Sequence, residues 1–283
     1  MERPSIIDDL VRAESLLIEG ENEAAEQLLS RLAEDAEEYV DRNCPTTDEV
    51  QWFSFPTLFE RLAYRRVEND PRELRDFGEP LDRLYADLAL ANVRLGDYER
   101  ASAALRQAVR WNPMGCGYRL DLAGLYLTNG DVNEFLALTY SVFERASEAR
   151  HLVRAFLNFA GWFAQSGQAR QAAAALRCAR KFDIPDTALE DALGEAAGTD
   201  HDPDSLSDAE ASQVLSAEGL PDGANAEVAV CLLMCATDAA NAGMRELATT
   251  LTIRARDLVG APAAAALIEL IHEADAAEPE AGE

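Results

Sequence analysis

The sequence has few basic side chains and no long apolar run. Its 283 residues include 25 Lys and Arg against 52 Asp and Glu, so the formal net charge is −27. Nucleic acids and anionic membranes bind clustered basic side chains, so this balance argues against both as partners. No apolar stretch approaches the length of a membrane span. The start, MERPSIIDDL, lacks the basic region and apolar core of a signal peptide. We therefore expect a cytoplasmic protein.

Histidine and cysteine are also scarce, which leaves little for metal or redox chemistry. There are three histidines and an odd number of cysteines, five, at scattered spacings. Cys231 and Cys235 stand one helical turn apart in an apolar stretch, where small buried side chains fit better than a ligand pair or redox couple. His201 is the only histidine among carboxylates, in a turn-rich acidic loop typical of a solvated side chain. We expect neither a metal site nor a cofactor-binding site.

Catalytic motifs are missing as well. The sequence has no glycine-rich phosphate loop before a helix, no Gly-x-Ser-x-Gly, and no histidine close to a cysteine. Acidic pairs four residues apart, such as Glu19 and Glu23, are more typical of a solvated helix face than of an acid–base pair. We therefore expect no catalytic residues and no enzyme activity.

What the sequence does have is a repeat of helical hairpins. Gly96 is followed 34 residues later by Gly130 and 37 residues after that by Gly167. Each glycine separates two segments with apolar residues at three- and four-residue spacing. This period is typical of the tetratricopeptide repeat (TPR), a helix–turn–helix unit that buries its apolar face by stacking on further copies. The pattern predicts an all-α fold, a right-handed α-solenoid.

Five segments follow from this pattern. They are an N-terminal TPR-like hairpin at 1–42, an aromatic loop with an inserted helix opened by Pro56 at 43–81, three TPR repeats at 82–186, a degenerate repeat with a TPR-like hairpin and closing helix at 187–275, and a disordered acidic tail at 276–283.

Small and large side chains set the expected helix spacing. Ala89, Ala160 and Ala236 fall where two helices must approach closely, so we predict that they lie at helix contacts. Phe135 and Phe143 replace alanine in the second repeat, where we expect a wider or shifted hairpin.

Three short motifs carry a family resemblance. They are WNP at Trp111–Pro113, FSFP at Phe53–Pro56 and EGLP at Glu218–Pro221. With the repeats, over residues 44–260, they make the chain similar to a family of bacterial TPR proteins of uncharacterised function. This resemblance implies an all-helical, adaptor-like protein and carries over no catalytic residues.

TPR stacks usually bind peptides on the first helix of each hairpin. Counting from the turn glycines, the predicted peptide groove comprises Arg83, Ala86, Leu90, Leu120, Leu127, Arg154, Leu157 and Asn158, with Gly124 and Gly161 between them. Only Arg154 fits the set that clamps a terminal carboxylate in chaperone-binding members, so we expect an apolar segment instead. Leu120 and Leu157 could equally pack against neighbouring repeats.

The charge distribution suggests a second surface. Residues 101–186 carry a net charge of +3, against −11 for residues 1–50 and −17 for 187–283. Arg106 and Arg110 lie one turn apart on one second helix, and Arg177 and Lys181 take the matching places two repeats on. This basic face could bind an anionic peptide or the chain's own acidic tail, or it could serve solubility alone.

Two functions are compatible with these patterns. The first is a cytoplasmic protein–protein interaction scaffold or adaptor that binds an unidentified peptide segment in the groove. The alternative is a peptide- or ligand-sensing TPR regulator without its own DNA-binding domain, since the acidic residues 1–50 disfavour DNA contact.

Overall fold

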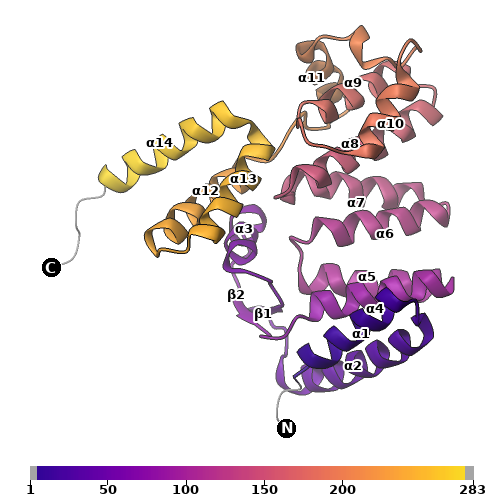
Figure 1. The fold of residues 1–283 in the computed structure, drawn as a ribbon, viewed down its shortest axis with the longest axis vertical. Coiled ribbons are helices and arrows are strands. Elements are labelled where there is room, and N and C mark those ends of the chain that lie inside the picture. Colours follow the sequence, from indigo (N-terminus) through magenta and orange to yellow (C-terminus); the bar gives the residue numbers. More distant parts are fainter. Residues whose placement is uncertain (1–4, 278–283) are drawn as a thin grey trace. The chain divides into compact units, whose positions relative to one another are not determined.

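The computed structural model describes the backbone of residues 5–277 and the side chains of residues 5–271 (Figure 1). These residues form fourteen α-helices and two short strands, which confirms the prediction of a predominantly helical chain. The tail was predicted to be disordered from residue 276; its residues 278–283 lie outside the described residues.

The chain divides into two compact units, Met1–Leu138 and Thr139–Glu283. The division falls inside α7, Val132–Arg145, the helix that carries Phe135 and Phe143. In the first unit the helices are α1 Ile7–Glu19, α2 Asn22–Asn43, α3 Leu58–Glu68, α4 Leu81–Leu95, α5 Tyr98–Trp111 and α6 Cys116–Thr128. In the second they are α8 Ala149–Gln165, α9 Ala169–Arg180, α10 Thr187–Ala196, α11 Asp208–Ala217, α12 Ala226–Asn241, α13 Arg245–Val259 and α14 Ala261–Ala277.

The turn glycines end the first helix of each hairpin. Gly96 closes α4 with φ of 79°, and its N–H reaches the carbonyls of Asn92 and Val93. An L side chain is strained at this left-handed φ, whereas glycine is not. Asp97 then caps α5 by accepting from the N–H of Arg100. The helix boundaries of the predicted hairpins follow from this local chemistry.

In the first unit, each second helix contacts the first helix of the next hairpin. α2 packs on α4, and α5 packs on α6, while α1 also touches α4. Leu10, Leu29, Leu84 and Trp111 are fully or almost fully buried between them. Ala89 is 2% exposed, as expected of a small residue at a helix contact.

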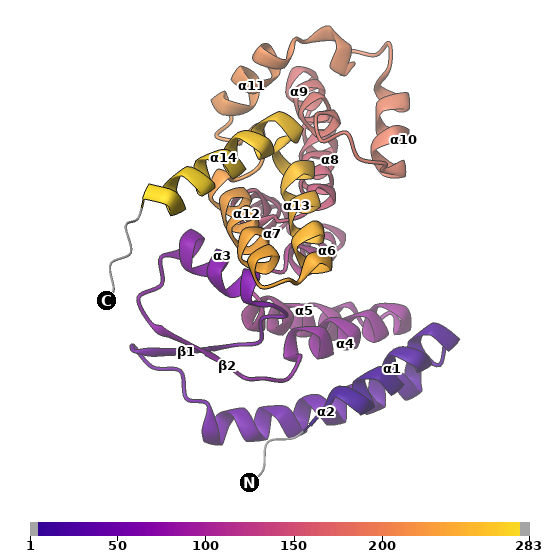
Figure 2. The same ribbon diagram turned by 60° about the vertical axis from the view of Figure 1, so that its left-hand side comes forward.

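The segment between α2 and α4 contains a small sheet that the sequence analysis did not predict. β1 (Val50–Phe53) and β2 (Glu73–Asp76) are parallel, with Val50 opposite Glu73, and α3 connects them (Figure 2). Pro56 does not open α3 as predicted: the helix begins at Leu58, because the Thr57 side chain accepts from a backbone N–H and caps it.

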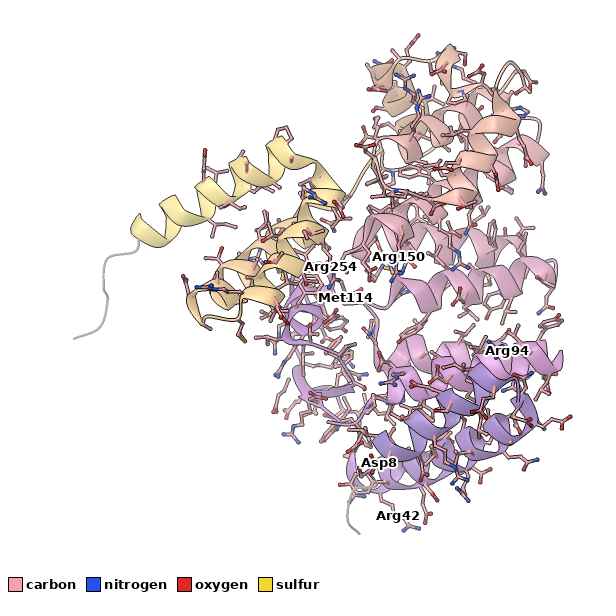
Figure 3. All side chains as sticks on the ribbon, in the orientation of Figure 1. Asp8, Arg42, Arg94, Met114, Arg150 and Arg254 are labelled. Carbon is pink, nitrogen blue, oxygen red and sulfur yellow. The ribbon has the colours of Figure 1, made fainter. Side chains whose placement is uncertain are left out.

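In the second unit, α8 pairs with α9, and α9 also packs on α11. Ser207 caps α11, as its sequence position predicts, in a reciprocal arrangement with Glu210. The hairpin of α12 and α13 is bonded to the end of α7 and to the α7–α8 connection. Arg254, which is labelled in Figure 3, donates to the Ser147 carbonyl and hydroxyl, and the Asn225 amide donates to the Glu144 carbonyl at 2.8 Å.

Candidate functional site

A cleft of about 480 Å³ opens at the N-terminal ends of the first helices in the first unit. α1 contributes Ile7, α4 contributes Arg83, and α6 contributes Tyr118. The segments on either side of α3 supply Ser54, Phe55, Pro56, Asp76, Gly78, Glu79 and Pro80, and α4 also adds Asp82. The cleft therefore combines apolar and aromatic side chains with a few polar groups, as ligand and peptide sites commonly do.

Asp82 forms the floor of this cleft and joins the FSFP and WNP motifs. It is 2% exposed and accepts from the Asn112 amide at 3.0 Å and the Tyr118 hydroxyl at 3.2 Å. The Ser54 N–H donates to the Trp111 carbonyl at 2.9 Å, and the Ser54 hydroxyl donates to the Glu79 carbonyl at 2.7 Å. Burial raises the pKa of Asp82, and these hydrogen bonds oppose the rise. Both motifs thus hold the cleft in shape.

A polar cluster lies next to the cleft, between α1 and α4. Arg83 forms an ion pair with Glu14, and the Asp87 carboxyl lies beside them. Burial raises the pKa of Asp87 to about 7; the Glu14 carboxyl adds to the rise, while Arg83 opposes it. One Asp87 oxygen is shielded from solvent and has no hydrogen-bond partner. The cluster therefore holds more acceptors than donors.

Large exposed apolar side chains are distributed unevenly between first and second helices of the first unit. The first helices carry Ile7, Val11 and Ile18 on α1, Leu90 and Leu95 on α4, and Leu127 on α6. Among the described residues of this unit, the second helix α2 has none, α5 has only Tyr98 at its start, and α7 has only Val132 at its start. We call the surface formed by Ile7, Val11, Glu14, Ile18, Arg83, Asp87, Leu90 and Leu127 the first-helix face.

The predicted groove residues fall into three environments. Leu90 and Leu127 are 40% and 44% exposed, and Arg83 and Arg154 are also exposed. Leu120 is fully buried and belongs to the core, the alternative that its apolar spacing had left open.

The remaining predicted groove residues, Ala86, Leu157 and Asn158, are half-buried. Asn158 also donates to the Thr139 hydroxyl at 3.3 Å. Arg154, Leu157 and Asn158 belong to the second unit, whereas the others belong to the first.

The sequence analysis missed the contribution of α1. Ile7 and Glu14 lie 13 and 6 residues before Gly20, the same offsets that place Arg83 and Leu90 before Gly96. Extending the count of the central repeats to the first hairpin would have found them. No sequence signal pointed to Asp87 or Tyr118, because their role depends on contacts between hairpins.

In the first unit, only one of the two arginines of the predicted basic face is exposed. Arg106 is exposed and donates to the Tyr126 hydroxyl at 3.3 Å. Arg110 is half-buried, and its guanidinium carbon lies 4.0 Å from the centre of the Trp111 ring. The Arg110 guanidinium thus packs on the Trp111 ring.

In the second unit, acidic residues between α10 and the start of α11 form ion pairs with Arg177, the arginine that corresponds to Arg106. Arg177 pairs with Asp208 at 2.6 Å and Asp204 at 3.4 Å, and Arg180 reaches Asp204 at 2.8 Å. Lys181 remains exposed. The positive charge of α9 is therefore largely neutralised within the unit.

Other site types find little support in the part of the chain that the structure describes. The five cysteines form no disulfide, and Cys231 is buried. His201 pairs with Asp200 at 2.7 Å, and no three His, Cys, Asp or Glu side chains converge on a possible metal position within the described range. None of the described helices combines the length and apolar character that a membrane span requires.

No protein-family model matches the sequence, and no significantly similar protein was found among curated proteins.

Proposed function

We propose that this chain is a TPR-type interaction protein that binds a segment of another polypeptide on its first-helix face. The observation that carries the proposal is the uneven exposure of large apolar side chains in the first unit: α1, α4 and α6 present them, and the second helices largely do not. Burial of such side chains drives association, and exposed apolar surface rimmed by polar groups marks an interaction site.

The packing order supports the TPR interpretation. α2 contacts α4 and α5 contacts α6, so each hairpin is covered by the next, as in a stack of repeats. The left-handed glycines Gly20 and Gly96 end successive first helices. The proposal of a solenoid therefore rests on helix contacts within the first unit.

The excess of carboxylates on the first-helix face indicates the charge of the partner segment. Glu14 and Asp87 share a single cation, Arg83, on the first-helix face. A partner segment that placed a lysine or arginine there would supply the missing donors and pair the second carboxylate. We therefore propose a segment with apolar side chains flanking a basic residue. Arg154, predicted as the charged anchor, is not needed for this proposal.

The compartment we propose is the cytoplasm. The free thiols of Cys44, Cys116, Cys178, Cys231 and Cys235 are typical of a reducing environment.

The test begins with selection of binders from a random-peptide display library against the full chain. The affinity of the tightest peptide is then measured for the wild type and for Leu90→Glu. The control is Leu247→Glu, the same substitution at a leucine of the second unit that is equally exposed, at 41% against 40%.

We expect Leu90→Glu to weaken binding at least about tenfold, as loss of an anchor residue does, and Leu247→Glu to leave it unchanged. If instead Arg106→Glu alone weakens binding, the partner uses the second-helix face and the proposal is wrong.

A further inference from the structure

The outer edge of β2 presents backbone groups that no strand of the described residues pairs with. The Glu73 N–H donates to the carbonyl of Glu49, just before β1, and the Phe77 N–H donates to the carbonyl of Phe53, at the end of β1, each at 2.8 Å. Backbone direction alternates along a strand, so the N–H and C=O of Leu74 and Asp76 point away from β1. Of these four groups, only the Leu74 carbonyl has a partner among the described residues: it accepts from the Arg61 guanidinium at 2.9 Å. Asp76 is exposed, but Leu74 is only 2% exposed, so the side chains that cover it must move before its backbone groups can pair with another strand.

A second cleft runs along this open edge. Its volume is about 250 Å³, and it is lined by Phe55, Pro56, Thr57, Leu58, Arg61, Leu74, Arg75 and Asp76. One wall is thus β2, and the other is the start of α3. On the outer side of α3, Leu58 is 66% exposed and Leu62, one turn later, is 39% exposed.

The α3 side of the cleft is positively charged, whereas β2 contributes the exposed carboxylate of Asp76. Arg61 and Arg65 lie one turn apart on α3, both are exposed, and neither forms an ion pair among the described residues. Arg75 on β2 is already paired with Glu73, at 3.0 Å. The cleft and the adjoining outer side of α3 therefore offer outward backbone groups of β2, two exposed leucines and two guanidinium groups without a carboxylate partner among the described residues.

We propose that this edge receives an extended acidic segment of a partner protein, which adds to β2 as a third strand. The outward N–H and C=O groups of Leu74 and Asp76 match the backbone of a strand, which is the chemistry of strand addition. Apolar side chains of the segment cover Leu58 and Leu62, and its carboxylates pair with Arg61 and Arg65.

Arg61 has a distinct role in this proposal. In the free protein its guanidinium covers the Leu74 carbonyl, which protects the edge from unintended pairing. When the partner strand donates its own N–H to that carbonyl, Arg61 is released to bind a carboxylate of the segment. The residue that shields the edge thus becomes the anchor of the bound strand.

The test uses acidic seven-residue peptides selected from a display library on the full chain. The strongest is compared with a version N-methylated at alternate residues, which keeps every side chain but cannot pair with β2. Both are measured on the wild type, on Leu62→Ser and on the control Leu247→Ser, whose leucine is equally exposed at 41%. Thermal unfolding by circular dichroism checks that Leu62→Ser is folded.

We expect N-methylation at the positions facing β2 and Leu62→Ser each to weaken binding at least about tenfold, with Leu247→Ser unchanged. Arg61→Ala should weaken acidic peptides and spare their neutral analogues. Three results overturn the proposal: no selected peptide, equal binding after N-methylation, or weaker binding in Leu90→Glu, which belongs to the first-helix face, with Leu62→Ser unchanged.

Discussion

Replacing Asp82 by alanine tests whether the cleft in the first unit depends on this buried carboxylate. The side chain is 2% exposed and accepts from Asn112 at 3.0 Å and from Tyr118 at 3.2 Å. Asn112 is 4% exposed, so its amide would lose its partner without access to water. A buried polar group left without a partner costs about 1–3 kcal/mol.

Asp82→Ala costs less free energy at the other hydrogen-bond partners of Asp82. Tyr118 is half-buried and can turn toward solvent, and the Ser54 hydroxyl keeps its bond to the Glu79 carbonyl. Removing a buried carboxylate also relieves its own desolvation, which raises the pKa of Asp82 in the folded protein. Because the relief of desolvation offsets the smaller losses, the expected loss for Asp82→Ala is about 1–3 kcal/mol, with Tyr118→Phe costing about 1 kcal/mol.

The assay is urea unfolding followed by circular dichroism and by the combined fluorescence of the three tryptophans, one of which, Trp111, precedes Asn112. Asp82→Asn serves as the control because it keeps one acceptor oxygen, so its loss should be clearly smaller than that of alanine. A loss below about 0.5 kcal/mol for Asp82→Ala would refute the reasoning, because it would place the change among ordinary surface substitutions.

Three further outcomes follow from single sites. Because the folded pKa of Asp87 is raised to about 7, the folded state binds the proton more tightly, and stability should fall as pH rises from about 4 to 7. Allowing for partial solvent screening, this effect is about 1–2 kcal/mol in pH-dependent unfolding, and Asp87→Asn should abolish it. Ala89→Leu should overpack the contact of α4 and lower the unfolding free energy by about 1–3 kcal/mol, and an unchanged thermal midpoint would mean that the predicted helix contact is wrong. Arg72→Ala should cost about 1–3 kcal/mol, measured by chemical denaturation, because Asp70, only 7% exposed, loses its guanidinium partner; Arg75→Ala, at an exposed pair, should cost less than 1 kcal/mol.

Local chemistry explains why much of the helical pattern was predictable. Gly96 ends α4 because its φ suits glycine, and Ser207 begins α11 because its hydroxyl caps the first turn. Both signals lie within a few residues of the feature they specify. Helix boundaries set by caps and turn glycines can therefore be deduced without knowledge of the rest of the fold.

The small sheet and the polar clusters could not be predicted in this way. β1 and β2 have four residues each, too few for a periodic pattern, and they pair across α3. The environments of Leu120 and Asp87 depend on neighbouring helices rather than on their own spacing. Leu120 has the apolar character of both a groove residue and a core residue, so only packing could decide that it is buried.

Methyl NMR of the full chain, with labelled isoleucine and leucine side chains, tests the central proposal most directly. The peptide selected for apolar residues around a basic one is added stepwise, and the methyl signals are followed. The account predicts that Ile18, Leu90 and Leu127 shift, while the buried Leu84 and the exposed Leu247 of the second unit do not. Shifts confined to Leu247 and Ile253, with Leu90 unchanged, would contradict it.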